Sequence, residues 1–92
     1  MAVITEVVAV RAGEHTVVTA DSDWRVTALS VRDPDLSVSI ADGFNRVERL
    51  LRAPEYDLNT NILLARGSRL IFHNMARDVF EWRYALFTAE TL

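Results

Sequence analysis

The stretch Leu36-Ser37-Val38-Ser39-Ile40 alternates apolar and polar side chains at every step. Successive side chains of a β-strand point to opposite faces, so this alternation places one face of a strand in a core and the other in water. The same period continues at Leu70 and Phe72, which alternate with Arg69 and His73. We therefore take a strand with one buried face as the basic unit of the fold.

Turn-forming residues separate such segments at intervals of about 8–12 residues, which is typical of antiparallel sandwiches and barrels. All 3 glycines and both prolines lie in these breaks. The breaks are Gly13, Asp21–Asp23, Asp33–Asp35, Asp42-Gly43, Ala53-Pro54, Arg66–Ser68 and Ala76–Asp78. We predict an all-β fold, an antiparallel β-sandwich of jelly-roll-like type with about 7–8 strands. Residues 1–92 form a single domain, because a chain of 92 residues is too short for two cores.

The segment around residues 44–52 fits two structures. Four apolar residues follow the possible N-cap Asp42 at helical spacing: Phe44, Val47, Leu50 and Leu51. This spacing predicts one short helix that ends before Pro54. The dipeptide Asp42-Gly43, in contrast, is typical of the type I′ turn of a hairpin, with a strand after it. We favour the hairpin and keep the helix as the alternative.

Charge and hydropathy exclude several classes of partner. The net charge of −3 gives no basic surface for nucleic acid or anionic lipid. The apolar run at the N-terminus has no basic segment before it and contains Glu6, so it is not expected to be a signal peptide. No stretch reaches the roughly 18 apolar residues of a membrane span. We expect a protein made in the cytoplasm that binds neither nucleic acid nor membrane.

Residues with catalytic or metal-binding chemistry are sparse. The chain has no cysteine, and its 2 histidines, His15 and His73, are too few for a metal site by themselves. No Gly-x-Ser-x-Gly motif and no glycine-rich phosphate loop is present. The pairs Asp21/Asp23 and Asp33/Asp35 are interpreted as turn residues rather than calcium ligands. We expect no catalytic residues, no metal and no cofactor.

The aromatic residues divide into two groups. Phe80, Trp82 and Tyr84 alternate with charged residues, so we predict that these rings face the core together with Leu86. Trp24 and Tyr56 lie near expected loop edges and are candidate ligand-facing aromatics for stacking on a sugar.

Apolar residues occupy both faces of the first and last expected strands, whereas a strand of an antiparallel sandwich normally needs only one apolar face. The surplus indicates a subunit interface or a covered sheet edge. Loops of the same chain could also cover it. The candidate interface residues are Val3, Ile4, Val7, Val8, Val79 and Phe87.

Several segments together resemble the small β-sandwich virion proteins of tailed bacteriophages. The similar order is a glycine turn and valine strand, a Gly-Ser turn between apolar strands, an asparagine, and an aromatic-rich last strand. The segments are residues 10–18, 24–31, 38–43, 61–74 and 80–86. The resemblance implies a capsid decoration (cement) protein, a head-fibre base or a tail component, and a homo-oligomer, often a trimer. It supplies no catalytic residues, and residues 44–58 depart from the usual short hairpin.

The first functional hypothesis is therefore a non-enzymatic structural protein of a phage particle, located in the virion. It would stabilise the shell through contacts with itself and with the major capsid protein or other virion proteins. The alternative outside this class is a small carbohydrate-binding module that stacks sugars on Trp24 and Tyr56.

Overall fold

A computed structural model of the chain describes residues 2–31, 33, 35–42, 47–51, 58–78 and 80–92. These residues form eight strands and no helix. The strands are β1 (Val3–Arg11), β2 (His15–Thr19), β3 (Trp24–Val31), β4 (Leu36–Ala41), β5 (Val47–Leu51), β6 (Leu58–Leu64), β7 (Arg69–Asn74) and β8 (Trp82–Thr91). No helix in this part of the chain is long and apolar enough to cross a membrane.

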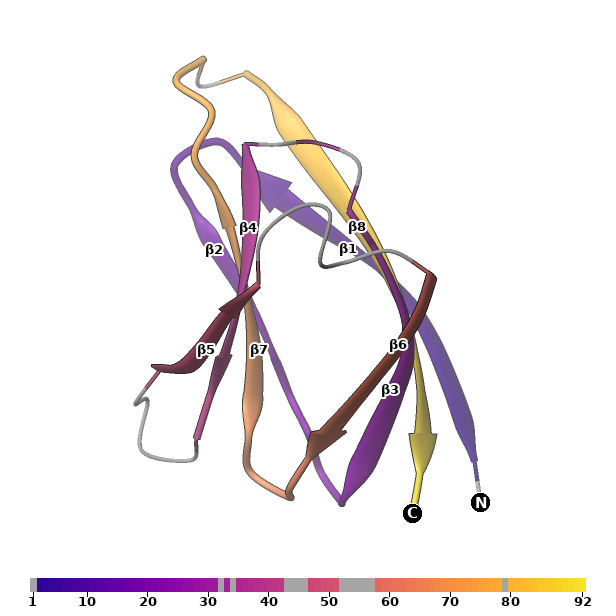
Figure 1. The fold of residues 1–92 in the computed structure, drawn as a ribbon. Helices are drawn as coiled ribbons and strands as arrows, with labels where there is room; N and C mark the ends of the chain where they lie inside the picture. The colour runs from indigo at the N-terminus through magenta and orange to yellow at the C-terminus, as the bar shows by residue number, and fades with distance from the viewer. Residues whose placement is uncertain (1, 32, 34, 43–46, 52–57, 79) are drawn as a thin grey trace.

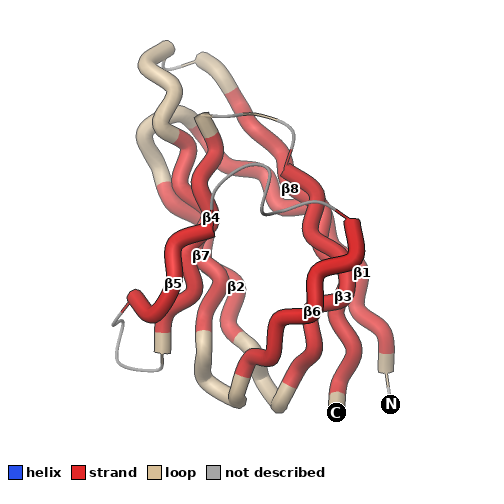
Figure 2. The backbone as a smooth tube through the Cα atoms, in the orientation of Figure 1, coloured by secondary structure: helices blue, strands red, loops and turns tan. Residues whose placement is uncertain are grey.

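The strands form two four-stranded antiparallel sheets, and Figure 1 shows them facing each other. Sheet A has the order β1-β8-β3-β6, and sheet B has the order β2-β7-β4-β5. The first four strands therefore pair with the last four in reverse order, as if one long hairpin were rolled up on itself. This is the topology of a jelly roll, and it confirms the predicted sandwich. Figure 2 shows that the described part consists of strands and connecting loops alone.

The structure of residues 47–51 decides between helix and strand for part of the segment 44–52. They form β5, which pairs with β4 from Val38↔Leu51 to Ala41↔Val47. The alternative of a short helix around residues 44–52 is therefore wrong for 47–51, because these backbone groups pair with β4 instead of with their own turn. The antiparallel pairing of consecutive strands agrees with the favoured hairpin. Its turn at Gly43 lies outside the described residues.

The core lies between the two sheets. Its largest fully buried side chains come from both sheets and include Leu29 and Phe87 on one side and Leu36, Leu70 and Phe72 on the other. Leu36, Val38 and Ile40 all face inward, as their alternation predicts. The inward orientation of Leu70 and Phe72 is likewise confirmed.

A β-bulge in β3 explains why that strand has no simple alternation in its sequence. Trp24 and Val26 are buried, and after an irregularity between Val26 and Ala28 the buried positions become Leu29 and Val31. The extra residue shifts the inward side by one position along the chain. A strict period of two therefore fails across this strand.

The predicted inward face of β8 is wrong. Ala85, Phe87 and Ala89 are buried, whereas Trp82 and Tyr84 are exposed. Since β8 lies between β1 and β3, its register with two strands whose valines and leucines face inward fixes its orientation. A shift of one residue exchanges the buried and exposed faces of a strand. The prediction assigned the face with the bulky rings to the core, whereas the opposite face is buried.

Candidate functional site: the outer face of sheet A

Among the described residues, six large apolar side chains are exposed on the outer face of sheet A. Leu63 of β6 is 65% exposed, and the other five come from the neighbouring strands β1 and β8. Their exposed fractions are 66% for Val3, 68% for Val7, 49% for Trp82, 60% for Tyr84 and 42% for Leu86. We call these five residues the apolar face of sheet A. They lie outside because the opposite side of the same strands carries the core residues Val8, Val10 and Phe87.

The strand register brings these side chains together. Val7 lies opposite Leu86, and Tyr84 is opposite Ala9, one step further along the same face. Cross-strand partners on one face have Cβ atoms about 4.5–5.5 Å apart, and the next pair on that face follows after about 6.6–6.8 Å. The apolar face is therefore continuous from Trp82 to Leu86 on β8, with Val7 beside it.

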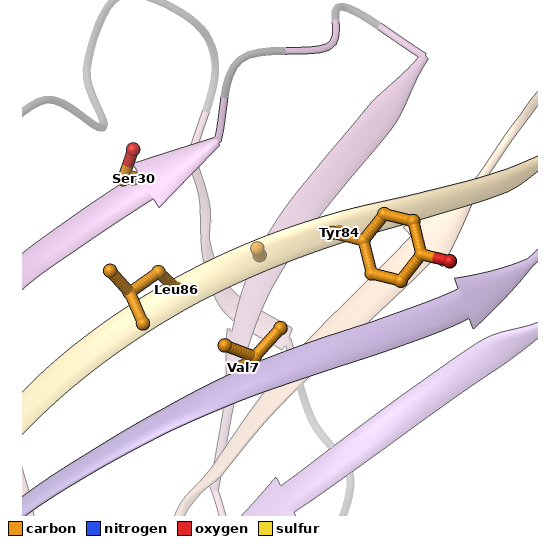
Figure 3. A pocket seen from close by; sticks show the side chains of 5 residues that line it. Val7, Ser30, Tyr84 and Leu86 are labelled. Carbon is orange, nitrogen blue, oxygen red and sulfur yellow. The ribbon is translucent and has the colours of Figure 1, made fainter.

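An open hollow of about 270 Å³ lies in the middle of this face. It is lined by Val7, Ser30, Tyr84, Ala85 and Leu86. Figure 3 shows the side chains of Val7 and Leu86 close together on adjacent strands, with the Tyr84 ring further along β8. The hollow is mainly apolar, with polar atoms at its margin from Ser30 and Tyr84. It can receive an apolar or aromatic group of a partner, but it holds no set of titratable groups for chemistry.

Charged residues mark the two ends of the face. Arg11 is paired with Trp82 at one end, and Glu90 is paired with Val3 at the other. Glu90 also lies opposite Arg25 of β3. The face thus has an apolar centre, a basic corner at Arg11, and the oppositely charged residues Glu90 and Arg25 at the far end.

The candidate interface residues from the sequence do not all lie on this face. Val3 and Val7 do, whereas Ile4 and Val8 point to the core, where Ile4 is partly buried and Val8 is buried. Phe87 is fully buried and cannot contact a partner of the folded chain, so its assignment to an interface is corrected. Val79 lies outside the described residues.

The assignment of Trp24 as a ligand-facing aromatic is also wrong. Its side chain is only 4% exposed, and its ring stacks on Phe87 with a centroid distance of 6.4 Å. The first residue of β3 already belongs to the core, although it follows a turn directly. Tyr56, the second candidate, is not among the described residues. The exposed rings Trp82 and Tyr84 were missed as surface residues because alternation with Glu81 and Arg83 assigned them to the core.

Arg83 lies on the core side of β8 but at the open end of the sandwich, among three carboxylates. Its Nε is 2.5 Å from Asp33 Oδ2, and its Nη2 contacts Glu81 and lies 3.8 Å from Asp35 Oδ2. The contact with Asp33 is an ion pair without hydrogen-bond alignment of the Nε–H. Desolvation lowers the pKa of Arg83, but the carboxylates of Glu81, Asp33 and Asp35 outweigh it and the net pKa is raised. The cluster links Asp33 and Asp35, which precede β4, to Arg83 of β8, and its charges balance in part.

A second contact that the sequence does not predict, between two histidines, lies on the outer face of sheet B. His15 and His73 stack on each other with a centroid distance of 4.0 Å and an interplanar angle of 11°. Burial and, to a smaller extent, the charge of His15 lower the pKa of His73 below its ordinary value of 6.5. No spacing in the sequence indicates this contact, because it depends on the register of β2 with β7. Within the described residues, no group of three or more His, Cys, Asp and Glu side chains could hold a metal ion.

Comparison of the chain with protein-family models, with curated proteins and with solved structures found no match.

Proposed function

We propose that the chain is a non-enzymatic structural protein that is built into a larger assembly through the apolar face of sheet A. The observation that carries this proposal is the exposure of Trp82, Tyr84 and Leu86 together with Val7 on one continuous sheet face. Single exposed apolar residues are ordinary, but a contiguous group of this size marks a contact surface. Trp and Tyr are also the residues that contribute most to binding energy in protein interfaces.

The partner that fits best is a second copy of the chain. When two such faces meet with their strands running in opposite directions, the Arg11 corner of one copy approaches Glu90 of the other. The apolar centres at Leu86 and Val7 then lie against each other. The face is therefore complementary to itself in its apolar centre, and Glu90 of each copy provides a carboxylate near Arg11 of the other, as a two-fold contact requires.

A virion shell is the assembly we infer for this contact, with the chain as a capsid decoration protein. The jelly-roll topology supports this inference by analogy, because capsid domains commonly have it. A fold by itself does not determine a function, and the main support for this assembly is the exposed face together with the sequence resemblance. A trimer would require a heterologous contact, in which this face meets a different surface of the neighbouring copy.

The test compares two exposed valines on the outer faces of the two sheets. Val7 lies on β1 in the apolar face of sheet A, and Val17 lies on β2 in sheet B, 50% exposed. We expect Val7→Arg to convert an oligomeric wild type to monomers, because it places a cation in the apolar centre of the contact. Val17→Arg, the matched control, should leave the oligomer unchanged.

The measurement is sedimentation velocity or light scattering at protein concentrations from about 1 to 100 μM, a range that covers ordinary association strengths. Circular dichroism confirms that each variant is folded. A wild type that stays monomeric throughout this range contradicts self-association. Equal loss of association in the two variants shows that the contact does not depend on the apolar face.

A second candidate function is the binding of carbohydrate on Trp82 and Tyr84. It is favoured by the exposure of the two rings on one face, and lectin domains also use jelly rolls. Because Trp24 is buried and Trp82 is half exposed, a sugar that stacks on this face should change the emission of Trp82 alone. An unchanged glycan response in a Trp82→Ala variant would exclude this site.

A further inference from the structure

The two histidines of the chain meet on the outer face of sheet B, opposite to the face considered above. His15 is the first residue of β2 and is exposed, and His73 lies in β7 and is half-buried. The two residues are direct register partners. In Figure 1, β2 lies at the edge of its sheet beside β7.

The hydrogen-bond pattern next to the pair explains why the rings are so close. Asn74 N donates to Glu14 O at 3.1 Å, and Gly13 N donates to Asn74 O at 2.8 Å. These bonds make Asn74 a hydrogen-bonded position of the β2–β7 pairing, one residue beyond His73. Hydrogen-bonded and non-hydrogen-bonded pairs alternate in an antiparallel ladder, so His15 and His73 form a non-hydrogen-bonded pair. This is the type of pair whose side chains approach most closely, with Cα atoms about 4.5 Å apart.

The two imidazoles are close enough to reach one metal ion. A zinc–imidazole bond is about 2.0–2.1 Å long, so the two nitrogens on one ion lie within about 4.2 Å of each other. The ring centroids are 4.0 Å apart, and the rings are nearly parallel, at 11°. In this stacked arrangement the nitrogen lone pairs lie in nearly parallel planes and do not converge. Binding of one ion therefore requires rotation of the rings, and the Cβ–Cγ torsion of histidine is broad enough to permit it.

We propose that His15 and His73 together bind one divalent first-row transition-metal ion of the kind that imidazole prefers, such as Zn²⁺, Ni²⁺ or Cu²⁺. The sequence alone indicated that two histidines are too few for a metal site. In this proposal water supplies the remaining ligands, because the pair lies at the surface. The bound ion clips the edge strand β2 to β7. Hard ions such as Mg²⁺ and Ca²⁺, which prefer oxygen ligands, do not bind there.

A clip at this position has a structural use. β2 contains only five residues and lies at one edge of sheet B. Small domains often need a disulfide or a metal for additional stability, and this chain has no cysteine. An ion that binds the folded pair and not the unfolded chain raises stability through linkage.

Imidazole binds a metal through a nitrogen that carries no proton, so zinc binding should weaken when the solution is made acidic. Ser37 of β4 is the register partner of His73 on its other side and adds no charge.

The test is a titration with ZnCl₂ of protein that carries no polyhistidine tag, followed by calorimetry and by thermal unfolding. We expect one ion per chain and a melting temperature that rises with zinc. His15→Gln and His73→Gln should each weaken binding at least tenfold and abolish the zinc-dependent rise. Val17→Gln, on the same face of β2, is the matched control and should behave as the wild type. MgCl₂ should have no effect on any of these proteins.

Three results would overturn the proposal. The first is zinc binding of equal affinity in the wild type and in the two histidine variants. The second is no heat of binding and no thermal shift up to millimolar zinc. The third is a stoichiometry of one ion for two chains, which would place the ion between copies. If a glutamine variant is unfolded by circular dichroism, the shift of the histidine ring proton resonances of the wild type on zinc addition decides the question.

Discussion

Replacement of Phe87 by alanine tests the assignment of the two faces of β8 directly. Phe87 is fully buried, and its ring stacks on Trp24 at 6.4 Å. The small residues Ala85 and Ala89 lie on either side of it on the same face and cannot fill the space of the lost ring. Removal of a buried Phe side chain costs about 3–5 kcal/mol, and the poor ability of this site to collapse favours the upper part of that range.

The matched substitution on the same strand is Tyr84→Ala. Tyr84 is 60% exposed on the outer face, so its removal leaves no cavity in the isolated domain. Surface substitutions of this kind usually change stability by no more than about 0.5 kcal/mol. The two variants differ in which face of β8 they alter, while the strand and the type of change are the same.

The assay is unfolding in guanidinium chloride, followed by circular dichroism and tryptophan fluorescence at two protein concentrations. The second concentration separates the stability of the domain from stabilisation by association, which depends on concentration. If Phe87→Ala is too unstable to give a native baseline in the unfolding curve, Phe87→Leu should show a smaller decrease in the free energy of unfolding. A larger loss for Tyr84→Ala than for Phe87→Ala, independent of concentration, would refute the orientation of β8.

Two further predictions concern polar side chains. Asn74 is fully buried and donates from Nδ2 to Val10 O at 2.9 Å and to Glu81 O at 3.3 Å, while its Oδ1 accepts from Ala76 N at 2.9 Å. Asn74→Ala should therefore cost about 2–3 kcal/mol in denaturant unfolding, and Asn61→Ala, on an exposed position of β6, should be nearly neutral. Because the pKa of His73 is lowered in the folded chain, the unfolded chain binds the proton of this residue more tightly. The free energy of unfolding is therefore unaffected by His73 protonation above pH 6.5 and decreases as the pH falls below this value. Melting temperatures measured from about pH 5 to pH 8 should show this fall in the wild type and a flatter profile in His73→Gln.

The sequence predicts the fold of this chain well because its turns and periods are local. Gly13 and Gly67 lie in breaks that the sequence indicates, and they have the positive φ angles of 76° and 89° that favour glycine in such turns. Leu36–Ile40 and Leu70–Phe72 reveal their buried faces by alternation alone. The sandwich follows from the number and spacing of such strands.

The surface of the molecule is much less predictable from the sequence, because it depends on register. On β8, either set of alternate residues is apolar enough for the core, and only the pairing with β1 and β3 decides between them. In β3 the bulge at Thr27 breaks the period, so no fixed alternation could assign its faces. The contact of His15 with His73 follows from the pairing of strands that are far apart in the chain. Each of these features is a property of neighbouring strands and not of any one segment.

The association proposed above is expected to use the apolar face of sheet A rather than the edge of β1. An edge strand exposes backbone groups that can pair with another chain, and an inward-pointing charge is a common protection against this. Glu6 lies on the same side of β1 as Val8 and Val10 but is exposed, so a strand added at this edge would have to bury its carboxylate. Nearer the end of β1, Thr16 Oγ1 of β2 donates to Ala9 O at 3.1 Å and occupies one of these edge groups. The edge of β1 is thus protected by the carboxylate of Glu6 and by a side chain of β2. The face formed by Val7, Tyr84 and Leu86 has no charge at its centre, so a partner can cover it without burying an ion.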